Sequence, residues 1–376
     1  MKVALPTLSL LTELQTATRV ASTRSAVQAL SGVQLEASEG YLEVRATDME
    51  IGLRLRLSAD VSAPGMVVLP ARLLLDIVRM LPDADVTIEV RAEQQDVEIV
   101  SGSAVVHLRT LRSEDFPRLP DHGEGPSLEL EVGPFVETVA RVARSASRDD
   151  TRPILTGILV LASDSSLRMV ATDSYRLSVK TTPLTSVVSA PFEANVPARA
   201  LQELARIATL SGAKKIGIAR RDNQIVFTLG DDAADDPTVV LSSRLIDGQF
   251  PNYQQLLPDS AEHELRVARE ELAEIVRRVS LLAQKNAPLR LAFSEGELRV
   301  SAQTPDIGEA HETLPIPFAG QPFEIGFNPE FFRDGLESLE SDEVLIKLTS
   351  PLRPGLIESA DGSGFVYLVM PIRLGT

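Results

Sequence analysis

An internal repeat constrains the fold of this chain more than any other feature of its sequence. The tripeptide Ala-Thr-Asp, reached through alternating apolar residues, occurs at 46–48 and again at 171–173, 125 positions later. Pro-Ala-Arg occurs at 70–72 and again at 197–199, and "DFPRLPD" from Asp115 is echoed by "QFPNYQQLLPD" from Gln249. Because three features recur in the same order at nearly the same offset, the sequence predicts duplicated structural units.

The last third of the chain repeats the pattern more loosely. "GELRVSAQTPDIGEA" from Gly296 resembles the Thr-Asp stretches, and "EIGFNPEFFRDGLESL" from Glu324 resembles the Pro-Ala-Arg segments. The joints "LPDHGEGPS" and "LLPDSAEHE" are rich in Pro, Gly and charge, as linkers are. We therefore expect three domains, at residues 1–121, 127–258 and 261–376.

Each predicted domain has the same order of elements. Apolar residues at three- and four-residue spacing predict opening helices at 8–20, 134–146 and 270–282. Strands with period-two alternation follow, such as 51–57, and a second helix follows each Pro-Ala-Arg. Two helices and about eight strands per domain indicate an α+β fold, with the helices packed on antiparallel sheet.

Composition excludes several classes of protein. The chain has 376 residues, a net charge of −16 and no cysteine, so it has neither a disulfide nor a thiol nucleophile. No apolar run approaches the ~18 residues of a membrane span, and the amino terminus is a poor signal peptide, so we expect a cytoplasmic protein without a membrane partner. The acidic balance repels phosphate at long range, so any contact with nucleic acid has to be local.

Basic residues recur on corresponding predicted helices despite the acidic total. Residues 137–148 contain three Arg and one Glu, a local balance of +2. One interpretation is a set of solvated helix faces with cations near helix C-termini. The other is that a ring of such domains directs every first helix, with its arginines, toward one centre.

Specific motifs add a family resemblance. With the threefold repeat, "ATDSYRL" at Ala171, "LIDGQFPNY" at Leu245 and "YLVMPIRL" at Tyr367, the chain resembles the bacterial sliding clamp, the beta subunit of DNA polymerase III, over its whole length. The resemblance implies three copies of one clamp domain and a head-to-tail homodimer that closes a six-domain ring around duplex DNA. It implies a non-catalytic processivity factor with no cofactor and no metal. It also implies as partners the polymerase III alpha subunit, the clamp loader, and other polymerases and repair proteins that carry clamp-binding peptides.

The resemblance also implies site residues. The second Thr-Asp turn would form part of a pocket for short peptides, made by Leu155, Thr172, Ser174, Tyr175, Arg176, Leu177, Pro251, Gln255, Leu256, Leu352, Pro354, Leu368, Val369, Met370, Pro371 and Ile372. The residues that would face DNA are Arg24, Arg72, Arg141, Arg144, Arg148, Arg152, Arg199, Arg206, Arg277 and Arg278. The subunit contact would use Val106 and Leu108 against Leu281 and Leu282, for which ordinary core packing is the alternative. The first Thr-Asp turn would be scaffold without a pocket.

The chain departs from the family pattern at several of these positions. Ser174 and Tyr175 stand where relatives often carry Gly and His, Gln255 stands where a basic residue is common, and Pro354 is unusual in its strand. Asp149 and 153–154 stand where some relatives offer Gln and Tyr to DNA. The departures at 174, 175, 255 and 354 bear on which peptides the pocket prefers. Those at 149 and 153–154 bear on the role of this loop at DNA, for which the resemblance carries over only Arg152.

Motifs that would indicate other functions are incomplete or absent in the sequence. A hydrolase with Ser174 as nucleophile would need a base within reach and an oxyanion site, and no G-x-S-x-G motif accompanies this serine. The acidic run at 230–237 lacks the ligand pattern of a calcium loop, and the histidines at 107, 122, 263 and 311 have no metal-ligand spacing. No phosphate-binding G-x-x-x-x-G-K-[ST] occurs, so energy for opening a ring has to come from a partner. An unrecognised hydrolase or a repeat-built scaffold remains the alternative to a clamp.

Overall fold

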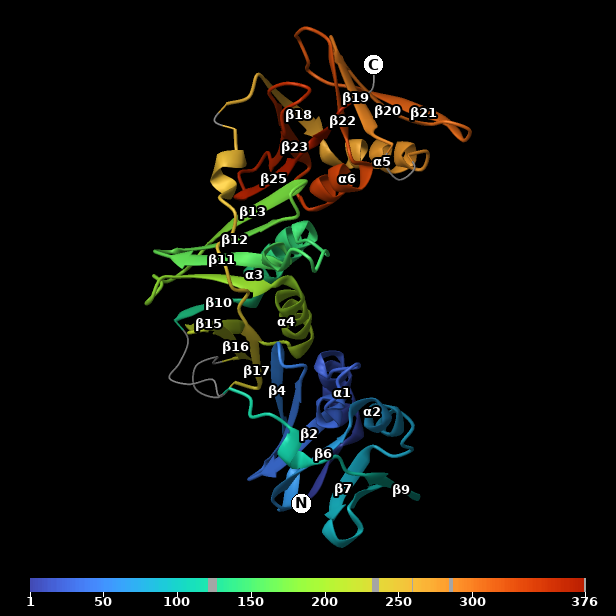
Figure 1. Ribbon diagram of the computed structural model, residues 1–376, viewed down its shortest axis with the longest axis vertical. Helices are drawn as coiled ribbons and strands as arrows, with labels where there is room; N and C mark the ends of the chain where they lie inside the picture. Colours follow the sequence, from blue (N-terminus) through green and yellow to red (C-terminus); the bar gives the residue numbers. More distant parts are fainter. Residues whose placement is uncertain (121–126, 232–236, 259, 284–286, 375–376) are drawn as a thin grey trace. The chain divides into compact units, whose positions relative to one another are not determined.

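The computed structural model describes residues 1–120, 127–231, 237–258, 260–283 and 287–374 (Figure 1). His122 and most of the acidic run at 230–237 lie outside these residues, as does the predicted joint at 121–126. The described residues contain the helices α1 (Thr7–Val20), α2 (Ala71–Arg79), α3 (Val132–Val142), α4 (Ala198–Ser211), α5 (Arg269–Ser280) and α6 (Pro329–Glu337). None of these helices is long and apolar enough to cross a membrane.

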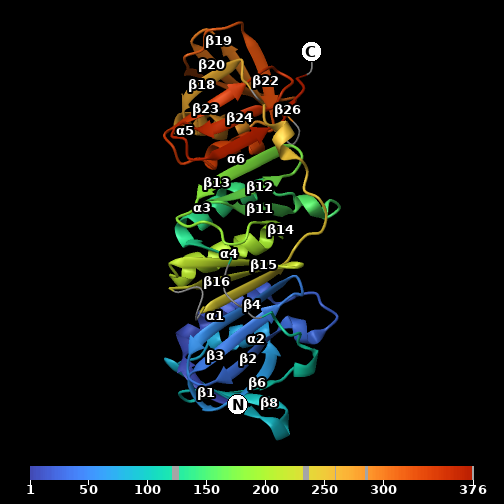
Figure 2. The same ribbon diagram turned by 90° about the vertical axis from the view of Figure 1, so that its left-hand side faces the viewer.

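The strands form four antiparallel sheets, which Figures 1 and 2 show from two sides. The first sheet has the order β5 (Asp60–Ala63), β1 (Lys2–Pro6), β7 (Asp85–Arg91), β8 (Asp96–Ser101) and β9 (Ala104–Arg109). The second has the order β10 (Leu128–Glu131), β15 (Lys215–Arg221), β16 (Gln224–Gly230), β17 (Val239–Arg244), β4 (Ile51–Ser58), β3 (Tyr41–Thr47), β2 (Gly32–Ser38) and β6 (Gly65–Pro70).

The other two sheets come mainly from the second half of the chain. The third has the order β14 (Phe192–Pro197), β11 (Gly157–Ser163), β12 (Ser166–Thr172), β13 (Arg176–Pro183), β25 (Phe365–Val369), β24 (Gly355–Ser359), β23 (Glu343–Leu348) and β18 (His263–Ala268). The fourth has the order β21 (Gly308–Pro315), β20 (Glu297–Thr304), β19 (Leu289–Ser294), β22 (Phe323–Phe327) and β26 (Pro371–Ile372).

Both eight-stranded sheets join strands from two of the predicted domains. β17 pairs with β4 through Leu241 and Leu53, and β13 pairs with β25 through Leu177 and Leu368. As a result the chain divides by contacts into two units, residues 1–133 with 203–245 and residues 134–202 with 246–376. The division passes through α3 and α4, so the middle predicted domain contributes to both units.

In the first unit α1 packs beside α2 and against β3 and β4. Leu10, Leu14 and Ala17 recur on one face of α1, and all three side chains are fully buried. They meet the inward side chains of the strands, such as Leu53, since alternate residues of β4 point to the same face. Burial of one such leucine contributes about 2 kcal/mol.

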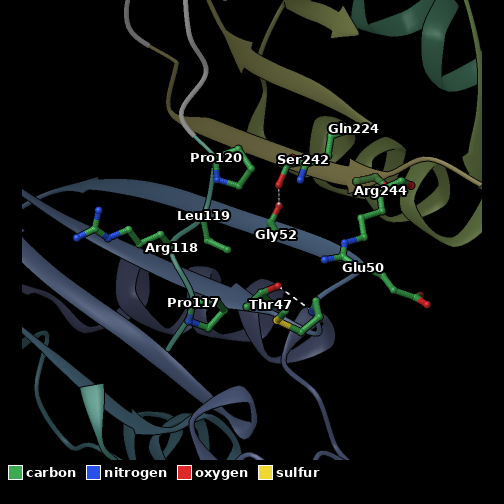
Figure 3. Close-up of a pocket in the computed structure, with 12 residues that line it drawn as sticks. Thr47, Glu50, Gly52, Pro117, Arg118, Leu119, Pro120, Gln224, Ser242 and Arg244 are labelled. Atoms are coloured by element: carbon green, nitrogen blue, oxygen red, sulfur yellow. Dashed lines mark hydrogen bonds between the residues drawn. The ribbon is translucent and has the colours of Figure 1, made fainter. Parts of the chain in front are cut away.

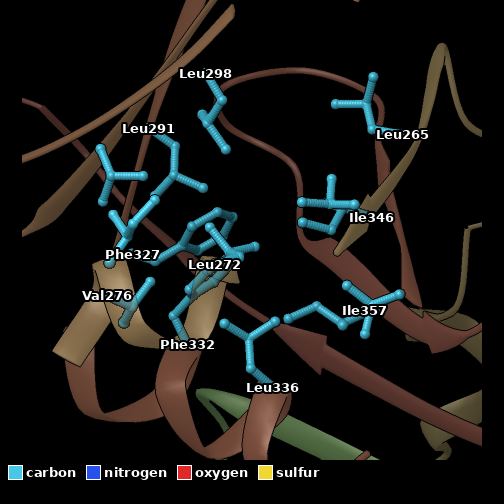
Figure 4. Close-up of a cluster of buried hydrophobic side chains, with 14 of the residues drawn as sticks. Leu265, Leu272, Val276, Leu291, Leu298, Phe327, Phe332, Leu336, Ile346 and Ile357 are labelled. Carbon is cyan, nitrogen blue, oxygen red and sulfur yellow. The ribbon is translucent and has the colours of Figure 1, made fainter. Parts of the chain in front are cut away.

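In the second unit α5 and α6 lie beside each other over a core that Figure 4 shows in detail. Leu272 and Val276 of α5 meet Phe332 and Leu336 of α6 there, together with leucines, isoleucines and phenylalanines of the adjoining strands. Gly335 lets α6 approach β25 closely, because a Cβ at this position would lie 2.6 Å from a ring carbon of Tyr367. The sequence has to place glycine there for α6 to pack where it does.

The predicted helices occur, but two of them end earlier than periodicity indicated. α3 ends at Val142 and continues as a 3-10 turn over Ala143–Ser145, where the N–H of Ala146 donates to the carbonyl oxygen of Ala143. α5 ends at Ser280, and the N–H of Leu282 donates to the carbonyl oxygen of Val279. In both cases the last turn tightens from α to 3-10 hydrogen bonding, which apolar spacing does not reveal.

Candidate peptide-binding site

The second Thr-Asp turn connects β12 to β13 and is closed by its own side chains. Thr172 Oγ1 donates to the carbonyl oxygen of Arg176 at 2.7 Å and accepts the N–H of Ser174 at 3.2 Å. Asp173 Oδ1 accepts the N–H groups of Tyr175 at 2.9 Å and Arg176 at 3.0 Å. Threonine and aspartate stand here because each can bond a nearby backbone group in place of a strand partner. Ser174 takes the left-handed conformation, with φ of 79°, which projects Tyr175 outward.

Arg176 fixes this turn to α6. Its guanidinium binds Asp173 Oδ2 through Nε at 3.0 Å and Asp334 Oδ2 through Nη1 at 2.5 Å, and it lies 4.3 Å from the ring centre of Phe331. Burial alone would lower the pKa of Arg176, but Tyr367 and the two carboxylates outweigh it and raise that pKa above its ordinary value. The arginine is therefore a fixed cation that locks the turn to the helix.

Four exposed apolar side chains of the second unit belong to this turn, to the short helix 253–256 and to the segments next to β24 and β25. Tyr175 is 59 % exposed, Leu352 64 %, Leu256 43 % and Met370 37 %. The N–H of Met370 donates to the carbonyl oxygen of Tyr175 at 2.8 Å, and the ring of Tyr175 stacks on that of Phe331 with 6.3 Å between centres. We call these four residues the Tyr175 surface. Exposed apolar groups on a rigid support are typical of a contact surface for a partner.

A buried cluster supports the Tyr175 surface from below. Leu177 and Leu368, which face each other across β13 and β25, pack with six further buried residues, Leu159, Val170, Val179, Phe250, Tyr253 and Leu356. The short helix Tyr253–Leu256 carries Tyr253 into this cluster and leaves Gln255 and Leu256 exposed. The cluster thus holds the exposed residues in place.

The structure brings only some of the predicted pocket residues to this surface. Val369 is fully buried in the core under α5 and α6, and Pro371 and Ile372 pair with β22 in the fourth sheet. Pro251 and Ser174 are exposed, Pro354 is half-buried and Leu155 is buried. Phe250, Tyr253, Phe331 and Asp334 also support this surface and were not predicted. The first two belong to "LIDGQFPNY", where their apolar character is a readable signal.

The predicted DNA-facing arginines fall into two groups. Arg24, Arg72 and Arg148 are exposed and make no ion pair within the described part of the chain, and Arg199 on α4 is exposed as well. The other six are held in ion pairs: Arg141, Arg144, Arg152, Arg206, Arg277 and Arg278. Arg141 is only 7 % exposed, bonded to Glu137 at 2.8 Å, and therefore serves the fold.

Two glutamates each bind a pair of these or neighbouring arginines. Glu203 binds Arg19 and Arg206, at 3.0 and 2.5 Å. Burial raises the pKa of the Glu203 carboxyl, but the hydrogen bonds from the two arginines outweigh this and hold its pKa below the usual range. Glu337 of α6 in the same way binds Arg144 and Arg277, at 3.2 and 3.3 Å. Such pairing leaves diffuse rather than concentrated positive charge.

Of the residues predicted for the subunit contact, Val106 and Leu108 lie on β9, whereas Leu281 and Leu282 follow α5, which packs against β21. β9 is an edge of the first sheet and β21 an edge of the fourth. Val106 is half-buried and Leu108 only 5 % exposed, since both share a face with the buried residues of β8, whereas Val105 on the other face is 57 % exposed. Leu281, just after α5, is 83 % exposed, and Leu282 is half-buried. Val105, which the sequence did not single out, is thus the most exposed apolar residue of β9.

Comparison with known proteins decides what kind of molecule carries these features. Models for the N-terminal, central and C-terminal domains of the DNA polymerase III beta subunit match residues 1–120, 129–252 and 254–373. The chain belongs to this family. It is 32 % identical to the beta sliding clamp of Synechocystis, covering 95 % of each chain, and 32 % identical to that of Streptomyces coelicolor, again covering 95 % of each.

Solved clamp structures agree with the whole fold. The sliding clamp of Bacillus subtilis matches with a TM-score of 0.93 at 27 % identity and covers 100 % of both chains. A sliding clamp from Pseudomonas aeruginosa bound to griselimycin matches with a TM-score of 0.91 at 29 % identity, again over 100 % of both chains. The three-domain α+β clamp fold predicted from the sequence is confirmed. As a family member the chain is a sliding clamp for DNA replication and an accessory, non-catalytic subunit of the polymerase.

Proposed function

We propose that this clamp binds its partners by docking their short apolar peptides on the Tyr175 surface. The observation that carries the proposal is the set of four exposed apolar side chains, Tyr175, Leu256, Leu352 and Met370, on a turn locked by Arg176. Leucine or phenylalanine anchors of a peptide would bury against these side chains, while polar backbone groups nearby hold the peptide main chain. Met370 suits several partners, because its thioether side chain adapts its shape.

Rigid support makes this docking effective. The Tyr175 carbonyl oxygen and the Met370 N–H already bond each other, and Tyr175 rests on Phe331. Little conformational entropy is therefore lost on binding, which favours affinity for a peptide with few contacts. The clamp relatives solved with griselimycin support a ligand site in this family.

We further propose that two chains close head to tail into a ring, with β9 of one chain against β21 of the other. Both are edge strands whose outer backbone groups are available for pairing. The exposed Val105 and Leu281 would supply apolar contact, and Val106 and Leu282 would be covered as well. A contact between two different surfaces forms a closed ring when its rotation allows, and closure removes both edges.

The ring would enclose duplex DNA and face it with the exposed arginines. Arg24, Arg72, Arg148 and Arg199 offer cations, while the acidic partners of the other arginines keep the attraction weak. Weak, sequence-independent attraction suits a molecule that slides, since each tight phosphate contact would add to the barrier for movement. The replicative polymerase alpha subunit, the clamp loader, other polymerases and repair proteins would be the peptide-bearing partners, in the cytoplasm.

Calorimetric titration with a pentapeptide of the Gln-Leu-x-Leu-Phe type tests the peptide site. We expect binding in the micromolar range, about −8 kcal/mol. Leu256→Asp should weaken it at least tenfold, because a charge would replace an apolar contact. Leu210→Asp is the matched control. Leu210 is also exposed, at 65 %, but it lies on α4 in the part of that helix that belongs to the other unit.

Equal weakening by both substitutions, or no binding to the folded protein, would refute the peptide site.

The ring contact has its own test in sedimentation velocity. The native chain should sediment as a dimer, and Leu281→Asp should shift it toward monomer, while Leu210→Asp should not. A monomer at micromolar concentration in the native protein would refute the proposed closure.

A further inference from the structure

The first Thr-Asp turn, expected to be plain scaffold, repeats the second bond for bond. Thr47 Oγ1 donates to the carbonyl oxygen of Ile51 at 2.7 Å, and Asp48 Oδ1 accepts the N–H groups of Glu50 at 3.0 Å and Ile51 at 2.8 Å. Met49 has a φ of 78°, against 79° for Ser174. The two turns therefore have the same backbone, and the positions of one can be read onto the other.

The neighbouring strand also repeats. The N–H of Arg244 donates to the carbonyl oxygen of Glu50 at 2.9 Å, as the N–H of Met370 does to Tyr175. Gly52 pairs with Ser242 across β4 and β17, as Leu177 pairs with Leu368 across β13 and β25. Arg244 thus takes the position of Met370, and Gly52 and Ser242 take the positions of Leu177 and Leu368.

The first turn has a hollow beside it. A cavity of about 90 Å³ lies under the first turn, lined by Thr47, Met49, Glu50, Gly52, Pro117, Arg118, Leu119, Pro120, Gln224, Ser242, Ser243 and Arg244 (Figure 3). Beside Gly52 the place of a leucine is taken by Leu119, because a Cβ on Gly52 would lie 2.7 Å from Ser242 Oγ and 3.1 Å from a methyl carbon of Leu119. The hollow therefore lies between the turn, the segment 117–120 and β17. A hollow of this size holds a few water-sized groups, and so takes a short side chain such as that of aspartate.

The hollow is also charged differently from the Tyr175 surface. The Arg244 side chain extends from β17 toward the turn, beside Gly52, while the carboxylate of Glu50 points away (Figure 3). Arg118 stands on the lining segment and is exposed. Neither arginine makes an ion pair within the described part of the chain, although this acidic protein pairs most of its others. Positive charge without a protein partner, over a hollow with serine hydroxyls, favours an anionic ligand.

We propose that this hollow is a second peptide site, which takes an extended segment bearing an aspartate. The aspartate side chain enters the hollow beside Leu119, its carboxylate binds Arg244, and the peptide main chain follows the Thr-Asp turn. This inference rests on the proposed function only in that both turns present the same backbone to a peptide. The ligand itself differs in chemistry.

Methyl-detected NMR tests the proposal on the full-length chain. The probe is acetyl-Gly-Asp-Ser-Asp-Gly-amide, with its Asn analogue as the uncharged control. We expect the Asp peptide to shift the methyl signals of Leu119 and Ile51 with saturation, and the Asn peptide to bind at least about tenfold more weakly. Arg244→Ala should weaken binding about tenfold, and Ser242→Leu should close the hollow. Arg299→Ala removes an exposed arginine of the other unit and should change nothing.

Several results would overturn the proposal. Equal shifts from the Asn peptide would show that the carboxylate does not contribute to binding. Shifts confined to Leu177 and Leu368 would place the ligand on the Tyr175 surface instead. Displacement of the Asp peptide by a short single-stranded oligonucleotide, with equal loss on Arg244→Ala, would make the hollow a phosphate site. Arg244→Ala keeps the test valid if Ser242→Leu fails to fold. If the Leu-Phe pentapeptide still binds while the Asp peptide does not, this inference alone falls.

Discussion

Removing Asp334 should loosen the peptide site without touching any residue exposed on it. In Asp334→Ala, Arg176 loses the carboxylate at 2.5 Å and keeps only Asp173 and the ring of Phe331. Breaking a buried ion pair costs about 3–5 kcal/mol when no other partner remains. The side chains here are 9 % and 16 % exposed, and one carboxylate remains, so we expect about 2 kcal/mol.

Hydrogen exchange measured by mass spectrometry reports this loss of stability segment by segment. About 2 kcal/mol corresponds to a roughly 30-fold fall in protection, and it should appear in β13 and α6 but not in β4 or α1. Affinity for the Leu-Phe pentapeptide should fall in parallel, because Tyr175 loses its fixed position. Glu340→Gln is the control, since Glu340 is 80 % exposed and its pair with Arg141 is worth little. Unchanged protection in β13 would refute the argument that Arg176 and Asp334 lock the turn.

Two further substitutions test the fold that holds the site. Gly335→Ala should destabilise the second unit by about 1–3 kcal/mol, seen as a lower melting temperature, because its methyl group would lie 2.6 Å from the ring of Tyr367; an unchanged melting temperature would contradict the close approach. Glu203→Gln tests a depressed pKa: the native carboxyl should stabilise the chain above about pH 4.5 and lose that advantage as the pH falls through its lower folded value. Melting curves of the two proteins should therefore differ at pH 7 and converge in acid, and a difference that grew on acidification would reverse the sign of the argument.

Much of the fold could be predicted from the sequence because the repeat carries it. Thr47-Asp48 and Thr172-Asp173 close their turns with bonds between near neighbours, and local bonds follow from local sequence. The apolar faces of α1 and α5 were likewise readable from spacing alone.

Features made by distant parts of the chain could not be predicted in this way. Asp334 is 158 residues from Arg176, and Phe331 meets Tyr175 only after β25 has paired with β13. The pairing of Arg144 with Glu337 is just as distant, so a basic helix read from sequence looked more positive than it is. The hollow beside Gly52 could not be predicted, because its lining comes from separate stretches of the chain, at 47–52, 117–120, 224 and 242–244.

Retention on DNA of different topology tests the central claim most directly. The clamp would be placed on a nicked circular plasmid by purified clamp loader with ATP, and free protein removed by gel filtration. A closed ring should stay on the circle through a rise to high salt, because no phosphate contact holds it, and should leave once one restriction cut makes the DNA linear. Equal retention on circular and linear DNA, or loss from the circle in proportion to salt, would show that charge rather than topology holds the protein, and would contradict the account.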